Sequence, residues 1–178
     1  MTQSPGFQIA DRERVHRVLG RMARRVHAEL GPDIRLVGIL RRGAPIAREL
    51  AGRLAELVGR EVETGTLRLE RYADDLTVIH DEPRLGEEDL PFEVEGARIV
   101  LVDDVIFTAR TFLRALVHLD AAGAAEVHLA ALCSRGPNEV PVHPGFVGLQ
   151  VDVGEGNVVE VHAPPYEEEW GIHLLHRK

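Results

Sequence analysis

The chain has 178 residues, of which 44% are hydrophobic and 28% charged, a composition typical of a globular protein with a full hydrophobic core. The formal net charge of −8 argues against a protein whose whole surface binds nucleic acid, although it leaves room for a local basic patch. Cys133 is the only cysteine, which excludes an intramolecular disulfide, and no apolar run approaches the roughly 20 residues that span a bilayer. We expect a cytoplasmic protein that folds as a single domain over residues 1–178.

The first predicted element is an amphipathic helix over Asp11–Leu30. Asp11 can cap its start, and Gly31 and Pro32 end it. Apolar residues recur at helical spacing and form one inward stripe: Val15, Val18, Leu19, Met22, Val26 and Leu30. Six arginines lie mostly on the other faces: Arg12, Arg14, Arg17, Arg21, Arg24 and Arg25. They form either a nucleic-acid-binding face or, as is more common, a solvated surface diluted by acidic neighbours.

A buried strand over Ile34–Leu40 and a helix from Pro45 follow. The helix residues expected to face inward are Ile46, Leu50, Leu54, Leu57 and Val58. Between strand and helix stand Arg41, Arg42 and Gly43, which present cations and backbone N–H groups to an anion. The alternative is a surface turn with two solvated arginines.

Residues Glu61–Glu70 alternate apolar and polar side chains, which predicts a third strand. From Arg71 to Phe92 this periodicity disappears, while acids and prolines accumulate. A connection of about twenty residues without a regular pattern is long for a compact domain, and such loops often act as lids.

The central feature is a strand, a loop and a helix in that order. The run Ile99–Val102 predicts a strand buried on both faces, which Asp103 and Asp104 end. Helical spacing then follows at Phe112, Ala115, Leu116 and Leu119. The hydroxyls of Thr108 and Thr111 lie beside the N–H groups of that helix start, which is the chemistry of a phosphate cradle. The alternative is a plain strand end with Thr108 as the helix cap.

Two further strands are predicted over Glu126–Leu132 and Asn157–Val161. Cys133 has no supporting nucleophile motif, and a buried small hydrophobe is its expected role. The tail, Ala163–Lys178, indicates no function. The alternation of strands and helices predicts an α/β fold with a mostly parallel central sheet and helices on both faces.

The acid pair followed by Thr108, Ala109, Arg110 and Thr111 resembles the ribose-phosphate loop of the type I phosphoribosyltransferases, with Ala109 where the usual loop has glycine. The resemblance covers about residues 15–162. It implies that loop amides and hydroxyls hold the 5-phosphate of phosphoribosyl pyrophosphate (PRPP), and that the two acids hold the ribose hydroxyls, directly or near Mg²⁺. The PRPP-binding set it implies is Arg41, Arg42, Gly43, Asp103, Asp104, Thr108, Ala109, Arg110 and Thr111.

Other segments carry the same likeness. Arg41–Gly43 resembles the family's pyrophosphate loop, and residues 71–92 its mobile hood. Within the hood, Arg71–Leu76 is similar to a Tyr-Arg-Asp-Asp-Leu segment of the PyrR branch, which implies a catalytic part for Tyr72 beside Asp103, Asp104 and Arg42. Cys133–Val142 resembles the PyrR segment that receives uracil, and the base-binding residues it implies are Ser134, Arg135 and Gly136.

The resemblance implies a uracil phosphoribosyltransferase of pyrimidine salvage, which makes UMP and pyrophosphate from uracil and PRPP with Mg²⁺, as a homodimer or higher homo-oligomer. PyrR proteins also bind messenger RNA and regulate pyrimidine genes. This chain departs from their basic residues, with Pro137 and Asn138 for His-Arg, His143 for an Arg, and Leu149 for a Lys. Two alternatives stay open. One is an RNA-binding attenuator with vestigial catalysis; the other is a transferase for another base, because Cys133 and Ser134 alter the base side.

Overall fold

The computed structural model describes residues 6–70, 84–136, 140–154 and 156–176. Its helices are α1 (Arg12–Leu30), α2 (Gly43–Val58) and α3 (Arg110–Ala121). Its strands are β1 (Phe7–Ala10), β2 (Arg35–Ile39), β3 (Thr64–Glu70), β4 (Arg84–Asp89), β5 (Arg98–Ile106), β6 (Glu126–Arg135), β7 (Phe146–Val151), β8 (Asn157–His162) and β9 (Gly171–His176). Within these described ranges, no helix is long and apolar enough to cross a membrane.

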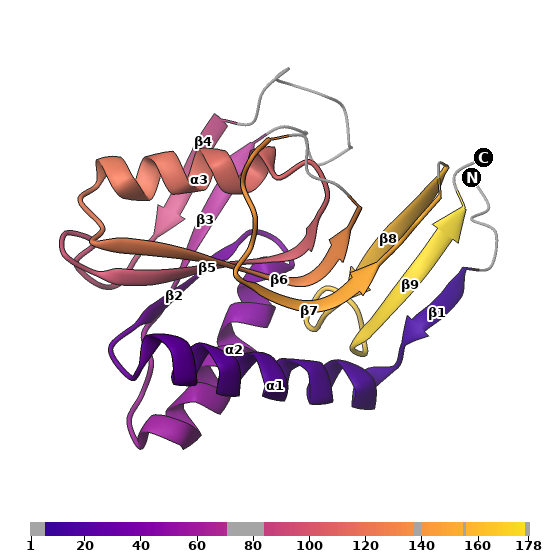
Figure 1. Ribbon diagram of the computed structural model, residues 1–178, viewed down its shortest axis with the longest axis horizontal. Helices are drawn as coiled ribbons and strands as arrows, with labels where there is room; N and C mark the ends of the chain where they lie inside the picture. The colour runs from indigo at the N-terminus through magenta and orange to yellow at the C-terminus, as the bar shows by residue number, and fades with distance from the viewer. Residues whose placement is uncertain (1–5, 71–83, 137–139, 155, 177–178) are drawn as a thin grey trace.

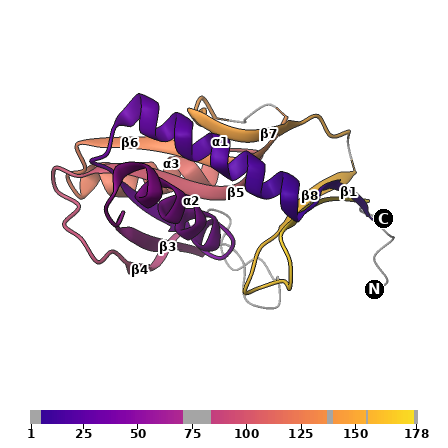
Figure 2. The same cartoon turned by 90° about the horizontal axis from the view of Figure 1, so that it is seen from below.

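Six strands form the central sheet in the order β4-β3-β2-β5-β6-β7. All neighbours pair in parallel except β3 and β4, which are antiparallel. Helix α3 covers one face, and α1 and α2 cover the other (Figures 1 and 2). Each face therefore has its own apolar cluster, with Leu19 and Leu50 on the α1–α2 side and Phe112 and Leu119 on the α3 side. The predicted α/β class is confirmed.

The helices follow the sequence pattern closely. The Asp11 side chain accepts a hydrogen bond from the Arg14 backbone N–H at 2.8 Å, and Gly31 ends α1 with φ 75°. The predicted inward residues of α1 are all buried. Helix α2 begins at Gly43, two residues before the predicted Pro45. The prediction for Leu57 is wrong: it is 44% exposed, while Val58 in the same turn is partly buried against the core, so Leu57 lies on the outer side of the helix.

Two predicted boundaries are also wrong. Strand β5 continues through the acids to Ile106, and β6 continues to Arg135, because the parallel ladder between them persists as far as Ile106 opposite Ser134. The predicted irregular segment 71–92 contains β4, which pairs with β3 and extends the sheet. The remaining hood residues, 71–83, with Tyr72 among them, lie outside the described residues.

A second sheet, in the order β1-β9-β8, stands apart from the central one at the right of Figure 1. Both of its strand pairs are antiparallel. Of its strands, the sequence pattern predicts only β8; β1 has four residues and pairs with β9, which lies far from it in the sequence. The tail that indicated no function therefore supplies a strand to this sheet.

Candidate functional site

The loops that follow β2 and β5 lie side by side at the carboxyl edge of the central sheet. The two strands pair in parallel, with Gly38 opposite Val102, so the chain leaves both at the same edge. The contact between them requires glycine: a Cβ atom on Gly43 would stand 2.5 Å from the Val102 carbonyl oxygen. The predicted pyrophosphate loop, Arg41–Gly43, therefore lies directly against the strand that carries Asp103.

Two helices begin at this edge without a side-chain cap. Arg42 occupies the N-cap position of α2 and Ala109 that of α3, and neither helix has a side-chain hydrogen bond to its first turn at that position. Backbone N–H groups of both first turns are left for other acceptors, which is the geometry of an anion site. The alternative that Thr108 caps α3 is wrong, because its Oγ1 lies 3.5 Å from the Arg110 nitrogen and the cap position belongs to Ala109.

The predicted phosphate loop turns sharply at Ala109. This residue has φ 61°, in the left-handed region, and is the one non-glycine residue with a positive φ in the part of the chain that is described. Its methyl group is buried between the loop and the core. Thr108 is half-buried just before the turn, and Arg110 and Thr111 form the start of α3. The position that usually carries glycine thus keeps the glycine conformation.

The carboxylates of Asp103 and Asp104 accept hydrogen bonds from backbone N–H groups of their own strand. Asp103 Oδ1 accepts a hydrogen bond from the Asp104 N–H at 2.9 Å, and Asp104 Oδ1 accepts one from the Val105 N–H at 2.8 Å. Burial raises the pKa of Asp103 well above its ordinary value, and the Asp104 charge raises it further. Burial also raises the pKa of Asp104, although the Val105 N–H and the Arg42 charge oppose this. A bound cation or a developing positive charge would stabilise both carboxylates.

The two predicted loop cations make contacts that the sequence does not indicate. Arg42 donates to Glu167, with Nη2 2.5 Å from Oε1, and to Glu160 Oε1 at 3.3 Å. Arg41 is exposed, and its guanidinium lies 5.1 Å from the ring centroid of Tyr166. The second sheet and the turn before β9 therefore lie over the pyrophosphate loop. The sequence offered no signal for the two glutamates, which lie among many acidic residues.

The base-side residues occupy the carboxyl end of β6. Ser134 is buried and Gly136 turns the chain with φ 75°. Arg135 packs its guanidinium 4.2 Å from the ring centroid of Phe107, which links this segment to the phosphate loop. The Nε atom of Arg135 is buried without a hydrogen-bond partner among the described residues. Cys133 is fully buried one strand away from the acids, as expected for a small core residue.

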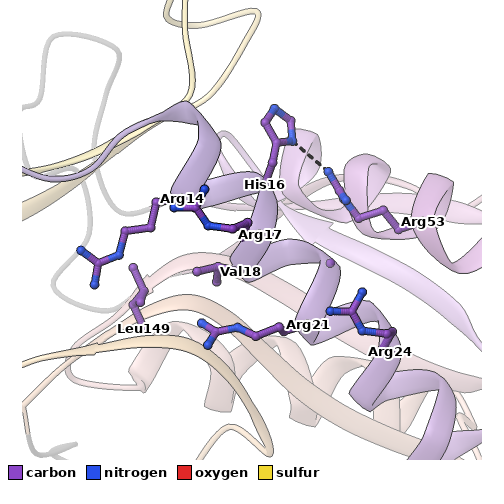
Figure 3. A pocket seen from close by; sticks show the side chains of 9 residues that line it. Arg14, His16, Arg17, Val18, Arg21, Arg24, Arg53 and Leu149 are labelled. Carbon is purple, nitrogen blue, oxygen red and sulfur yellow. Dashed lines mark hydrogen bonds between the residues drawn. The ribbon is translucent and has the colours of Figure 1, made fainter.

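Arginines from α1 and α2 line a separate cleft of about 750 Å³, which also reaches β7 (Figure 3). Its lining residues are Arg14, His16, Arg17, Val18, Gly20, Arg21, Arg24, Arg53 and Leu149. Gly20 lies beside two of these cations, since a Cβ there would make ordinary contacts of 3.4 Å with Arg53 Nη1 and 3.7 Å with Arg24 Nη1. Four of the six α1 arginines noted in the sequence therefore converge, and they are joined by Arg53 and His16, which no sequence pattern indicates.

Local acids neutralise only part of this cleft. Arg53 donates to Glu49 at 2.7 Å, and Arg17 lies 3.4 Å from Glu13. Arg21 and Arg24 have no hydrogen bond or ion pair among the described residues. The cleft therefore offers cations at a surface away from the acid pair.

A family model with the description "Phosphoribosyl transferase domain" matches residues 7–169. A protein of Pelotomaculum thermopropionicum named Bifunctional protein PyrR is 37% identical over 94% of this chain and 94% of its own length. The chain belongs to the PyrR family of phosphoribosyltransferases. A PyrR protein of Thermus thermophilus is 37% identical over 96% of both chains, and one of Roseiflexus is 40% identical over 81% of this chain and 80% of its own.

Solved structures agree on the fold. Hypoxanthine phosphoribosyltransferase from Trypanosoma cruzi, in complex with the product IMP, superposes with a TM-score of 0.77 at 16% identity, over 99% of this chain and 96% of its own. A purine phosphoribosyltransferase from Pyrococcus horikoshii gives 0.62 at 19% identity, over 78% of this chain and 83% of its own. The recognition made from the motifs is thus confirmed for PyrR membership and for fold, while the roles of individual site residues stay predictions.

Proposed function

We propose that this PyrR protein transfers a phosphoribosyl group from PRPP to uracil, releasing pyrophosphate and forming UMP. The observation that carries the proposal is the contact of Gly43 with β5. It joins a loop of cations and amides to the acid pair, and the same strand leads to the uncapped start of α3. A pyrophosphate, a ribose and a 5-phosphate each find matching chemistry along this edge.

Each segment has a separate part in the displacement at the anomeric carbon. The N–H groups and hydroxyls over Thr108–Thr111 bind the 5-phosphate. Asp103 and Asp104 hold the ribose hydroxyls, and their negative charge stabilises the positive charge that develops on the ribose ring. The Arg41–Gly43 loop binds the departing pyrophosphate, and the hood that contains Tyr72 excludes water. No covalent enzyme nucleophile is required.

The acid pair also fits Mg²⁺. Carboxylate oxygens are hard ligands, and Mg²⁺ is commonly bound by one or two carboxylates together with substrate phosphates. Bound there, Mg²⁺ would neutralise the pyrophosphate oxygens and the two acids.

The base is expected beside Ser134, Arg135 and Gly136. The Phe107–Arg135 contact brings this segment next to the phosphate loop, which supports this assignment. Uracil is the base that the likeness of residues 133–142 to the PyrR segment implies. Another base is the alternative, because Cys133 and Ser134 depart from that segment.

Pyrophosphate release from PRPP and Mg²⁺ with uracil, orotate, hypoxanthine or xanthine tests this function. We expect uracil-dependent turnover that Asp103→Asn and Asp104→Asn abolish. Asp120→Asn, an exposed acid on α3, serves as the matched control and should retain turnover. Turnover with another base would keep the mechanism and change the substrate. Tight PRPP binding without any turnover would instead identify a sensor that has lost catalysis.

A second function, messenger RNA binding, is favoured by the arginine cleft. Leu149, which stands where the PyrR likeness has a Lys, lines this same cleft, so the α1 arginines supply cations at the place where one is missing. Phosphate contacts from arginine provide most of the affinity for RNA. We therefore propose that the cleft is the RNA-contacting surface.

Binding of a single-stranded RNA of pyrimidine-operon leader sequence at several salt concentrations tests this surface. The double variant Arg21→Ala/Arg24→Ala should weaken binding and lower the salt slope by roughly one to two. Arg48→Ala, an exposed arginine of α2 outside the cleft, should change binding little. Absence of RNA binding by the unsubstituted protein at low salt would reject the second function and leave the first untouched.

A further inference from the structure

Arg42 is held along one edge of its guanidinium. Its Nε donates to Glu167 Oε1 at 3.2 Å, and its Nη2 donates to the same oxygen at 2.5 Å. Nη2 also reaches Glu160 Oε1 at 3.3 Å. In the described part of the chain, Nη1 makes no hydrogen bond. A guanidinium fixed along one edge in this way can present only its opposite edge to a ligand.

Glu167 is itself fixed. Its Oε2 accepts a hydrogen bond from the Ala163 backbone N–H at 2.8 Å, which closes the turn between β8 and β9. Its side chain is only 20% exposed. Burial alone would raise the pKa of Glu167, but the hydrogen bonds from Arg42 and Ala163 lower it below its ordinary value, so the group is a carboxylate at neutral pH. The glutamate is therefore a rigid acceptor.

Glu160 reaches Arg42 from the adjacent strand. In β8, Val159 and Val161 are buried in the core, so the alternation of the strand turns Glu160 to the opposite face. The two glutamates thus approach one arginine from a strand and from a turn of the second sheet. Arg42 also lies close enough to the acid pair for its charge to lower the pKa of Asp104.

We infer that Glu167, supported by Glu160, is a positioning residue for the transfer reaction: it fixes Arg42 so that the free edge of the guanidinium meets the pyrophosphate. This inference rests on the proposed function, because it requires that the Arg41–Gly43 loop binds pyrophosphate. It assigns the turn between the second-sheet strands β8 and β9 a part in substrate binding. In this role Glu167 acts through Arg42, with which it makes its side-chain contacts.

The two glutamates could instead weaken pyrophosphate binding through their negative charge. The two glutamates and one arginine sum to a single negative charge, and this charge alone would repel pyrophosphate. If repulsion were the main effect, removal of the Glu167 charge would strengthen binding. Positioning predicts the opposite, so one substitution distinguishes the two roles.

The experiment compares Glu167→Gln with Glu168→Gln, its exposed neighbour in the same turn. We expect E167Q to raise KM for PRPP roughly tenfold to a hundredfold, with a much smaller change in kcat, and to weaken binding of Mg²⁺-pyrophosphate alone in calorimetry by a similar factor. E168Q should match the unsubstituted protein in both. Glu160→Gln should give a smaller change in the same direction.

A double-mutant cycle with Arg42→Lys completes the test, because Lys cannot make the two-point contact. The effects of R42K and E167Q should fall well short of additive, since each removes the same contact. A KM that is unchanged or lower in E167Q, with its thermal midpoint unchanged, would overturn the inference. If the unsubstituted protein bound neither PRPP nor Mg²⁺-pyrophosphate, the proposed function itself would be at fault.

Discussion

Gly43 lies so close to Val102 that a methyl group on Gly43 would overlap the carbonyl oxygen of β5, at 2.5 Å. The neighbouring Gly38 is equally crowded, since a Cβ atom there would stand 2.5 Å from the Ala44 Cα atom. The two glycines therefore set how closely the loop, α2 and β5 approach each other. The first prediction concerns this spacing.

Gly43→Ala should destabilise the protein by about 1–3 kcal/mol, because the atoms that crowd the new methyl group are backbone and cannot rotate away. It should also impair PRPP binding by moving the loop from the acid pair. Gly52→Ala, in the same helix, should instead stabilise by roughly 0.5–1 kcal/mol, since nothing lies within 4 Å of its Cβ position. Urea unfolding of both variants gives the comparison; equal effects would refute the packing argument.

Ala109→Gly should increase stability by roughly 0.5–1 kcal/mol. The φ of 61° is strained for alanine, and glycine adopts it freely. Ala115→Gly, a buried position within α3, should lower stability by about 1 kcal/mol through loss of helix propensity. Thermal or urea unfolding of the pair should therefore give opposite signs. A destabilising A109G would show that the buried methyl group matters more than the backbone strain.

Asp103→Asn should make the protein more stable at neutral pH while it removes activity. An unfolded Asp has a pKa of about 3.9, and burial raises the pKa of Asp103 in the folded protein. Between these two values the folded state binds more protons, so stability falls as pH rises through that window. The gain in stability from D103N should be on the order of 1–3 kcal/mol at pH 7 and should vanish at about pH 3.5. Urea unfolding at both pH values checks it; a variant less stable than the parent at pH 7 would contradict the sign.

Cys133 should resist thiol reagents in the folded protein. Burial, with a smaller effect from the Asp104 charge, raises the pKa of its thiol to about 12, and the thiolate is the reactive form. Because it is the only cysteine, labelling by a disulfide reagent at about pH 8 reports on it alone. The reaction should be slow until denaturant is added. Rapid stoichiometric labelling of the native protein would show that the thiol is accessible.

The spacing of apolar residues predicted the helices and strands that bury one side in the core. It failed for strands and strand ends that exist only because they pair with another strand. The apolar spacing of α1 and its Asp11 cap are visible along the chain, as is the apolar run that becomes β5. The extension of β5 to Ile106 is not visible, because it depends on the ladder with β6. The same holds for β1, which is a strand because it pairs with β9, far away in the sequence.

The candidate site divides in the same way. Asp103 and Asp104 could be found from the sequence, because they directly follow an apolar run and come just before Thr108 and Thr111. Glu160 and Glu167 lie 118 and 125 positions from Arg42 in the sequence. Other acidic residues lie near them, and nothing in the sequence distinguishes these two. Arg53 joins the α1 arginines for the same reason, since only the packing of α2 on α1 brings it there.

The pairing of β1 with β9 also limits when the second sheet can form during synthesis of the chain. β1 ends at residue 10 and β9 begins at residue 171, so the earliest strand to emerge waits for one of the last before it can pair. The strands of the central sheet end at residue 151, so all of them precede β9 along the chain. The contacts of Glu167 with Arg42 then form at the end. In a nascent chain, Arg42 can therefore gain its contacts with Glu167 only after residue 167 has been synthesised.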